Sequence, residues 1–372
     1  MNRLTLLCPC LFGLEGILAD EIKRMGGQNV AAQNGRVLFE GGIEDIARAN
    51  ICLRTAERVL IMLGSFTARS FEELFQGVLA LPLEEFIGKK DAFPVKGWSL
   101  DSQLHSLPDC QAIIKKAAVK RLERIYHLSW FEETKATVQI RFSIFKDEVT
   151  VMLDTSGVGL HKRGYRRDST EAPIKETLAA GILDVARVKG YSTVYDPFCG
   201  SGTFLIEAAL RAQHIAPGLY RSFAAESWDS IGLKAWREER ERANTQIDRN
   251  IGFEAYGADI SQEAVELTLS NAKKAGVADC IHVKTAAIKD FCPESEKAVV
   301  VCNPPYGERL LDIRQAEDLY GVMGKVFRKQ EGYSYYVISP HEGFEKLFGR
   351  TADKRRKLYN GMIKCQLFMY FK

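Results

Sequence analysis

The chain has 372 residues, of which 46% are apolar and 27% are charged, and this composition is typical of a folded globular protein. A domain usually has about 100–200 residues, so the length predicts two or three domains. The formal net charge is only +3, which excludes a protein that binds nucleic acid through a global excess of positive charge and requires any such surface to be local.

Nine cysteines are scattered along the chain, and no two of them form a CxxC pair. We therefore expect reduced thiols, most of them buried, and no metal site. The first residues lack a basic stretch followed by a long apolar run, and no apolar segment approaches the ~20 residues that span a bilayer. These features predict a cytoplasmic protein with no membrane partner.

The first half of the chain predicts two successive α+β units. Apolar spacing and the Asn34-Gly35 turn indicate a strand, a helix, a hairpin and a second helix within about 60 residues. A second unit follows over about residues 66–155. Its expected elements are helices over 71–79 and 109–127 and strands over 137–144 and 149–154.

After about residue 165, short apolar strands alternate with helices, which predicts a doubly wound and mostly parallel sheet. The expected helices span 174–188, 203–210 and 262–275, and the expected strands span 193–195, 253–258, 281–283, 298–302 and 335–339. Such sheets bind ligands beyond the carboxyl ends of their strands. Residues 211–250 are predicted to be an insertion of exposed helices, because their sequence is highly charged.

A glycine-rich loop, DPFCGSGTF at 196–204, follows one of these strands and opens a helix. Gly200 and Gly202 remove side chains, so the backbone can approach a ligand closely, and the helix N-terminus offers free N–H groups. The loop is neither GxGxxG nor a P-loop. Asp196 would repel a pyrophosphate but suits the ammonium of a methionine moiety. We therefore predict an S-adenosylmethionine site, with Phe198 and Thr203 also in contact with the cofactor.

A second acidic residue, Asp259, stands at the end of the next strand beside Ile260. A carboxylate at that place can accept hydrogen bonds from both ribose hydroxyls, as in dinucleotide folds. The alternative is that Asp259 caps the helix over 262–275, although Ser261 could fill that role. We predict ribose binding for Asp259 and cofactor contact for Ile260.

The segment VVVCNPPYG at 299–307 predicts the catalytic loop. Pro304 and Pro305 hold the backbone extended and remove two N–H donors, which frees nearby carbonyl oxygens to face a ligand. Together with the amide oxygen of Asn303, these carbonyls can accept hydrogen bonds from an –NH₂ group and turn its lone pair toward a methyl donor. Tyr306 offers a ring for stacking an extruded base. The alternative is a Pro-Pro turn after a buried strand, with Tyr306 in the core.

The pair of motifs resembles the amino-methyltransferases of class I, which include adenine-N6 DNA methylases, guanine-N2 RNA methylases and glutamine methylases of release factors. Further motifs look like those of the bacterial THUMP-domain 23S rRNA guanine-N2 methyltransferases, and they cover nearly the whole chain. These motifs are CPCLFGLEGIL (8–18), FPVKG (93–97), LHKRGYR (160–166), APIKETLAA (172–180), QHIAPG (213–218), GER (307–309) and KLYNG (357–361).

This resemblance implies a ferredoxin-like subdomain over 1–62, a THUMP RNA-binding domain over 63–160 and a Rossmann-like methyltransferase domain over 161–372. It implies methylation of guanine N2 in 23S rRNA or in a ribosome-assembly intermediate. By matching position, it places Lys175, Glu176 and Thr177 at the methionine side of the cofactor. Family members often have an acidic residue that holds the cofactor adenine where this chain has Ala286-Ala287. Either Asp290 replaces it, or backbone and apolar contacts hold the adenine.

Two local clusters of basic residues are candidates for phosphate contacts, which position RNA without reading its sequence. The first cluster is within residues 110–128, where five cations meet one acid, and the second is the segment 161–167. The predicted RNA-binding residues are Lys115, Lys116, Lys120, Arg121, Lys162, Arg163, Arg166 and Arg167. The alternative for the first cluster is a solvated helix face.

Three other functions compete with RNA methylation. An adenine-N6 DNA methyltransferase would use the same chemistry but would need a domain that reads duplex DNA. A protein glutamine methylase would have no use for an RNA-binding N-terminus. A non-catalytic RNA-binding or ribosome-assembly factor would have no need for the intact Asn303-Pro-Pro-Tyr306 and Asp196.

Overall fold

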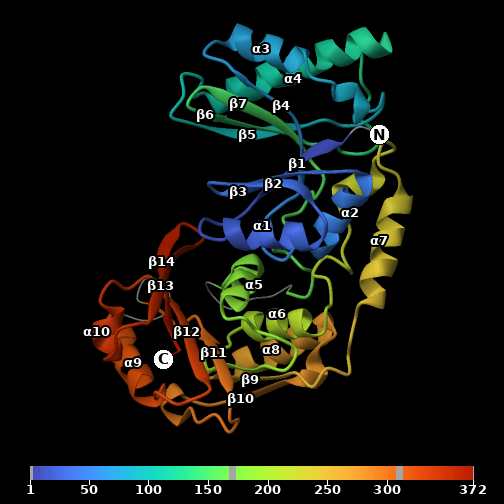
Figure 1. Ribbon diagram of the computed structural model, residues 1–372. Helices are drawn as coiled ribbons and strands as arrows, with labels where there is room; N and C mark the ends of the chain where they lie inside the picture. The colour runs from blue at the N-terminus through green and yellow to red at the C-terminus, as the bar shows by residue number, and fades with distance from the viewer. Residues whose placement is uncertain (1–2, 167–172, 307–312, 372) are drawn as a thin grey trace. The chain divides into compact units, whose positions relative to one another are not determined.

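The computed structural model describes residues 3–166, 173–306 and 313–371, and the chain divides into two compact units (Figure 1). The first unit contains Met1–Pro9, Ala19–Leu160 and Arg221–Arg242, and the second contains Cys10–Leu18, His161–Tyr220 and Ala243–Lys372. Each unit therefore includes a short segment whose neighbours in sequence belong to the other.

The first unit contains one seven-stranded sheet in the order β2-β3-β1-β4-β7-β6-β5. Its strands are β1 (Leu4–Pro9), β2 (Gln28–Gln33), β3 (Arg36–Gly41), β4 (Leu60–Thr67), β5 (Val95–Leu100), β6 (Ile140–Phe145) and β7 (Glu148–Asp154). Its helices include α2 (Ile43–Cys52), α3 (Phe71–Leu79) and α4 (Leu107–Tyr126), whereas α1 (Glu15–Arg24) and α7 (Leu233–Thr245) have residues in both units. The predicted hairpin is confirmed as β2–β3, with Gly35 in its turn at φ +71°.

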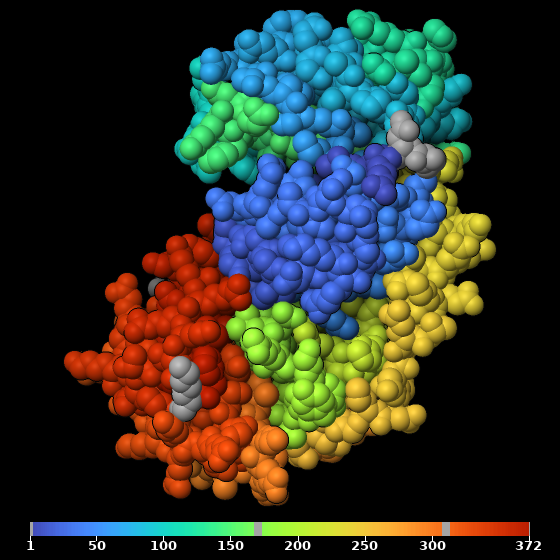
Figure 2. All heavy atoms as spheres, in the orientation of Figure 1, coloured from blue at the N-terminus to red at the C-terminus, as the bar shows by residue number. Residues whose placement is uncertain are grey.

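The helices predicted over 71–79 and 109–127 are confirmed as α3 and α4, which pack against each other on one side of the sheet (Figure 1). Figure 2 shows the atoms of this part of the chain, coloured blue to green, at the top of the picture. Ser70 caps α3 by accepting a hydrogen bond from the Glu73 backbone N–H at 3.2 Å, and the Glu73 carboxylate accepts one from the Ser70 N–H. This reciprocal capping box explains why α3 begins at Phe71.

The second unit contains another seven-stranded sheet, in the order β10-β9-β8-β11-β12-β14-β13. Its strands are β8 (Thr193–Asp196), β9 (Glu254–Asp259), β10 (Ile281–Thr285), β11 (Ala298–Cys302), β12 (Tyr333–Ser339), β13 (Lys354–Asn360) and β14 (Ile363–Tyr370). The first five are parallel, and β14 runs antiparallel to both of its neighbours. The predicted doubly wound, mostly parallel sheet is confirmed.

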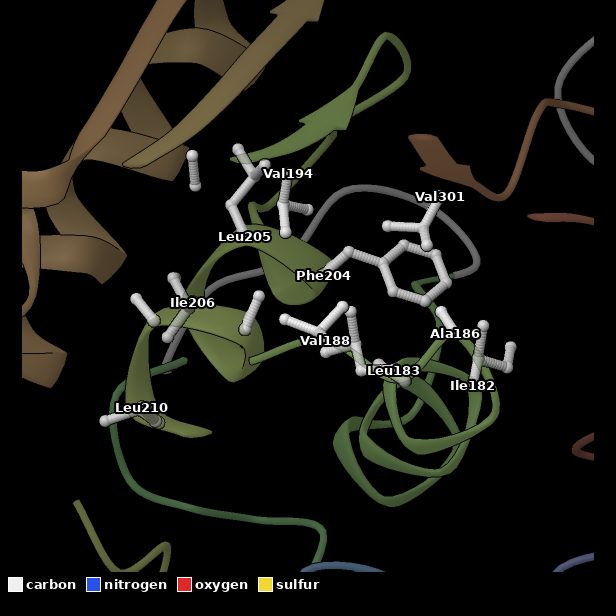
Figure 3. Packing of buried hydrophobic residues seen from close by; sticks show 14 of the residues in the cluster. Ile182, Leu183, Ala186, Val188, Val194, Phe204, Leu205, Ile206, Leu210 and Val301 are labelled. Carbon is white, nitrogen blue, oxygen red and sulfur yellow. The ribbon is translucent and has the colours of Figure 1, made fainter. Parts of the chain in front are cut away.

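Helices cover both faces of this second sheet. They are α5 (Glu176–Val185), α6 (Thr203–Ala212), α8 (Gln262–Ala275), α9 (Ile313–Val326) and α10 (Phe344–Phe348). Val194 and Val301 pack with the apolar residues of α5 and α6 (Figure 3), whereas Val300 and Cys302 pack with those of α9 on the other face. This alternation follows from the two-residue period of a strand that is buried on both faces.

The charged insertion at 211–250 differs from its prediction as a set of exposed helices. Trp228 and Trp236 are fully buried, and the Trp228 indole N–H donates to the Thr137 carbonyl at 3.0 Å. Glu239 of α7 forms a 2.7 Å ion pair with Arg48. The prediction of exposure is wrong for residues 221–242, which belong to the first unit and bury both tryptophans there. The high density of charged residues in the sequence does not reveal this burial.

All nine cysteines are free thiols, and seven are buried. Among the described residues, no helix is long and apolar enough to cross a membrane.

Candidate active site

Three neighbouring parallel strands of the second unit end at one cavity of about 700 Å³. β8 ends at Asp196, β9 ends at Asp259, and Asn303 directly follows β11. The order of the sheet reverses at β8, so this is the switch point at which doubly wound sheets bind ligands. Apart from these three residues, the cavity is lined by loop residues 197–201 and by Pro173, Ile174, Thr203, Phe204, Ile260, Ser261, Ala264, Ala286, Ala287, Ile288, Lys289, Pro304, Pro305, Tyr306, Gln315, Leu319 and Val322.

The glycine-rich loop turns sharply before α6 begins at Thr203. Gly200 and Gly202 both have positive φ, at +52° and +80°. A side chain at position 202 would place its Cβ 2.7 Å from a methyl group of Thr268, so this position requires glycine. Gly200 lines the cavity, whereas Gly202 acts through the turn that it permits.

Asp196 is a buried carboxylate that is only 2% exposed. It accepts a hydrogen bond from the Phe198 N–H at 3.1 Å, and among the described residues no cationic side chain pairs with it. Burial raises the pKa of the Asp196 carboxyl from 3.8 to about 8. A cationic ligand group in this cavity would supply the counter-charge that the protein does not.

The carboxylate of Asp259 is held by hydrogen bonds from two backbone N–H groups, one in the glycine-rich loop and one directly before α8. Its Oδ2 accepts a hydrogen bond from the Gly200 N–H at 3.0 Å, and its Oδ1 accepts one from the Ser261 N–H at 3.0 Å. The cap of α8 is Ser261, whose Oγ accepts from the Ala264 N–H at 3.2 Å. The alternative of Asp259 as the helix cap is therefore wrong, and its carboxylate faces the cavity from a fixed position.

Asn303 presents an amide oxygen that has no partner. Its Oδ1 is buried, and among the described residues it receives no hydrogen bond. Pro304 and Pro305 line the cavity beside it, as does Tyr306, which is 7% exposed and whose hydroxyl accepts from Asn360 Nδ2 at 3.3 Å. A buried acceptor without a donor costs about 1–3 kcal/mol, so a ligand with N–H groups would remove a penalty that is built into the site.

Three other residues that were predicted to contact the cofactor lie near the cavity but do not line it. Lys175 is the cap of α5, and Glu176 and Thr177 form its first turn, directly after the cavity-lining Pro173 and Ile174. These three residues do not line the cavity within the described part of the chain, and their contact with the cofactor stays a prediction. Asp290 lines a second cavity of about 500 Å³ beside the first one.

Several residues that line the cavity were not among the predicted site residues. Leu319 and Val322 come from α9, a helix that was not predicted, and Ala286 and Ala287 make an apolar wall where family members often have an acid. The spacing of Leu319 and Val322 on one face of a helix is the signal that could have revealed them.

In the second basic cluster, residues 161–167, two of the arginines are buried or nearly buried. The Arg163 side chain is 3% exposed, and its Nε lies 3.3 Å from the buried Glu207 carboxylate. Arg166 is 12% exposed; it donates to Thr203 Oγ1 at 3.0 Å and to Glu176 at 2.9 Å. The prediction that these two arginines contact RNA is wrong, because both are committed to buried carboxylates beside the cavity.

Of the other members of this cluster, Lys162 is exposed, and Arg167 lies outside the described residues.

The first basic cluster, on α4, is largely neutralised by acids that are distant in sequence. Lys115 pairs with Glu133 and Arg121 pairs with Glu84, in addition to the Lys120–Glu123 pair at 3.0 Å. Lys116 is exposed, with its ammonium 6.0 Å from the Phe75 ring. The excess of positive charge on this helix face is therefore smaller than its sequence indicates.

Comparison with known families gives three matches along the chain. The RMKL-like methyltransferase domain matches residues 163–368, the RlmL ferredoxin-like domain matches residues 5–60, and the THUMP domain matches residues 68–154.

Individual relatives cover the whole chain. YpsC of Bacillus subtilis, provisionally named an RNA methyltransferase, is 41% identical over 100% of this chain and 97% of its own length. The ribosomal RNA large subunit methyltransferase K/L of Psychromonas ingrahamii is 33% identical over 99% of this chain, and the match spans 50% of that longer protein. The crystal structure of SMU.472, provisionally described as a methyltransferase and complexed with SAH, is 40% identical, covers 100% of this chain and 98% of its own and has a TM-score of 0.94.

Proposed function

The chain belongs to the family of the RMKL-like methyltransferase domain, and we propose that it transfers a methyl group from S-adenosylmethionine to an exocyclic amino group of a base in RNA. The observation that carries this proposal is the buried, unpartnered Oδ1 of Asn303 in the cavity at the ends of β8, β9 and β11. A THUMP domain and relatives named as RNA methyltransferases support RNA as the substrate class.

The residues of the cavity fit this cofactor. Asp196 would pair with the ammonium of the methionine moiety, because it is a buried carboxylate with no cationic partner among the described residues. Asp259, held by two backbone N–H groups, would accept from the ribose hydroxyls with its remaining lone pairs. Apolar residues such as Leu319 and Ala287 would exclude water from the rest. When bound, the cofactor supplies a methyl group on a positively charged sulfur.

Asn303 and the two prolines would orient the accepting nitrogen. An amino group that donates its hydrogens to Asn303 Oδ1 and to a backbone carbonyl of the loop has its lone pair directed away from those acceptors. The same oxygens stabilise the positive charge that develops on the nitrogen as the new bond forms. Tyr306 lines the cavity and would stack on the base that carries this amine.

We further propose guanine N2 of 23S rRNA as the target. Relatives named as ribosomal RNA large subunit methyltransferases support the kind of RNA, and guanine N2 is what the resemblance of the sequence motifs implies. This target would place the enzyme in the cytoplasm with ribosomal RNA. We keep the proposed boundaries at 1–62, 63–160 and 161–372, and of the predicted RNA contacts we retain Lys116 and Lys162, which are exposed.

Transfer of label from S-adenosylmethionine carrying a tritiated methyl group tests this proposal. The purified protein is incubated with total RNA, DNA or protein from cells that lack the gene, and nuclease and protease treatments identify the labelled class. We expect label in RNA alone. Label that survives ribonuclease and is lost with deoxyribonuclease would favour an adenine-N6 DNA methyltransferase, and label in no fraction would favour a non-catalytic role.

A further inference from the structure

The last hairpin of the second unit, β13–β14, has an unusual concentration of positive charge. Residues 354–364 contain five cations (Lys354, Arg355, Arg356, Lys357 and Lys364) and no acid. Arg355 pairs with Glu345, whereas Lys354, Lys357 and Lys364 are exposed. β13 is the edge strand of the sheet (Figure 1).

Two aromatic rings lie beside this charge. Phe12 comes from the segment Cys10–Leu18, which belongs to the second unit, and its ring centroid is 6.0 Å from that of Tyr359 in an edge-to-face arrangement. Phe12 is 55% exposed, and the ammonium of Lys357 lies 5.4 Å from the centre of the Tyr359 ring. An exposed phenylalanine beside lysines is the combination with which proteins stack single-stranded bases while contacting phosphates.

The backbone brings the Phe12 segment close to the hairpin. A Cβ at Gly13, which has φ +92°, would lie 2.6 Å from the Lys357 carbonyl oxygen, so only glycine allows this approach. On the other side of the hairpin, Lys364 is directly opposite Tyr359 in the β13–β14 register. Because successive side chains of a strand point to opposite faces, Lys357, Tyr359 and Lys364 share one face of the hairpin, whereas Lys354 points from the other face.

The hairpin is linked directly to the proposed catalytic loop. Asn360, the last residue of β13, donates to the hydroxyl of Tyr306 at 3.3 Å. A strand of nucleic acid that lies along β13 therefore ends beside the cavity that would hold the target base.

Resting on the proposed function, we propose that the hairpin surface, defined by Phe12, Lys357, Tyr359 and Lys364, binds the single-stranded nucleotides that flank the target base. Phe12 and Tyr359 stack on flanking bases, and the two lysines contact flanking phosphates. This surface belongs to the methyltransferase unit itself and would act in addition to the THUMP domain.

The electrostatic part is tested with the full-length double variant Lys357→Ser/Lys364→Ser. Binding of a fluorescent single-stranded oligoribonucleotide of about 12 nucleotides is measured by anisotropy over a range of salt concentrations. Each phosphate contact contributes about 0.7 to the slope of log affinity against log salt, so the slope should fall by about 1.4. A matched double variant, Lys274→Ser/Lys329→Ser, removes two exposed lysines elsewhere on the unit and should keep the slope.

The stacking part is tested with Phe12→Ala and Tyr359→Ala. Each should weaken binding of the same probe about tenfold while leaving the salt slope unchanged, and Phe12→Trp should restore affinity. Tyr191, which is 86% exposed and precedes the opposite end of β8, provides the control Tyr191→Ala. Binding of S-adenosylhomocysteine, measured by calorimetry, should be the same in every variant and shows that each one is folded.

The outcomes separate this inference from the proposed function. If the wild-type protein labels RNA but the lysine and aromatic variants bind the probe as the controls do, the hairpin surface is not an RNA site and the proposed function stands. If the wild-type protein labels no RNA, both fail. A loss of probe binding confined to the hairpin variants, with cofactor binding intact, supports the inference.

Discussion

A buried amide oxygen without a donor, such as Oδ1 of Asn303, reduces the stability of the folded protein. We therefore expect Asn303→Ala to leave the free energy of unfolding unchanged or to raise it, since the unsatisfied acceptor is removed. Methyl transfer should fall about 100-fold or more, because an oriented polar contact to the reacting group is lost. Affinity for S-adenosylhomocysteine, measured by calorimetry, should stay nearly the same. A large loss of cofactor affinity would remove Asn303 from the amine site.

Because Asp196 is buried, we expect the stability of the protein without cofactor to fall as the pH rises toward 8. Its pKa is about 8 in the folded protein and 3.8 in an ordinary environment, so between these values the folded state holds a proton that the unfolded state has released. The contribution of Asp196 to the free energy of unfolding is complete below pH 3.8 and is lost as the pH rises through 8. The free energy of unfolding falls by at most about 1.4 kcal/mol per pH unit in this range. Asp196→Asn stays neutral and should lack this loss.

The measurement is urea unfolding of the wild-type protein and of Asp196→Asn, without cofactor, between pH 5 and pH 8. The variant should gain stability relative to the wild-type protein as the pH rises. Parallel pH profiles would show that the Asp196 carboxyl is already ionised at pH 5 and would contradict the effect of its burial.

At the scale of elements, the loop after β8 and the start of α8 are joined through Asp259, while Ser261 caps the helix. Asp259→Ala should weaken cofactor binding by about 1.5–3 kcal/mol, the typical value for lost hydrogen bonds to a charged group. Ser261→Ala should lower the free energy of unfolding by about 1 kcal/mol, because a helix cap is lost, and should leave cofactor affinity nearly unchanged. Calorimetry and urea unfolding of both variants test this separation; equal cofactor affinity in the two variants would contradict it.

The elements predicted best from the sequence are those whose apolar residues follow a clear pattern. α3 and α8 have the predicted bounds because apolar spacing and capping residues agree there, and β11 has them because it is an unbroken apolar run. β13 was not predicted, since four of its seven residues are cations and an edge strand needs little apolar alternation. The burial of Trp236 in a charged helix likewise depends on contacts with residues that are distant in sequence.

The three strand ends at the site were predictable because parallel strands bring their carboxyl ends to one edge. The ion pairs around the cations could not be predicted from the sequence. Arg163 meets Glu207 and Arg121 meets Glu84 only in the folded chain, and counting charges along the sequence places all such residues on the surface. The partners of a cation therefore decide its role, and the fold must be known to identify them.

At the scale of the whole molecule, the methyltransferase unit needs a segment from the start of the chain. Leu14 is fully buried in the core around α5, and its Cδ2 lies 2.7 Å from where a Cβ on Gly181 would be. We expect Leu14→Ala to lower the free energy of unfolding by about 2–5 kcal/mol. A fragment over 161–372, which lacks Leu14 and Ile17, should not unfold cooperatively. Thermal unfolding of both proteins tests this, and a fragment with the wild-type melting temperature would contradict it.

The central claim is that an exocyclic amine of an RNA base is methylated, with guanine N2 as the proposed position. Mass spectrometry of nucleosides from digested 23S rRNA, with and without the gene, tests it most directly. We predict one N2-methylguanosine that is lost without the gene, restored by the wild-type protein and not restored by Asn303→Ala. Identical nucleoside profiles with and without the gene would contradict the claim, and loss of a methyl group from a ring carbon or a ribose would contradict the role given to Asn303.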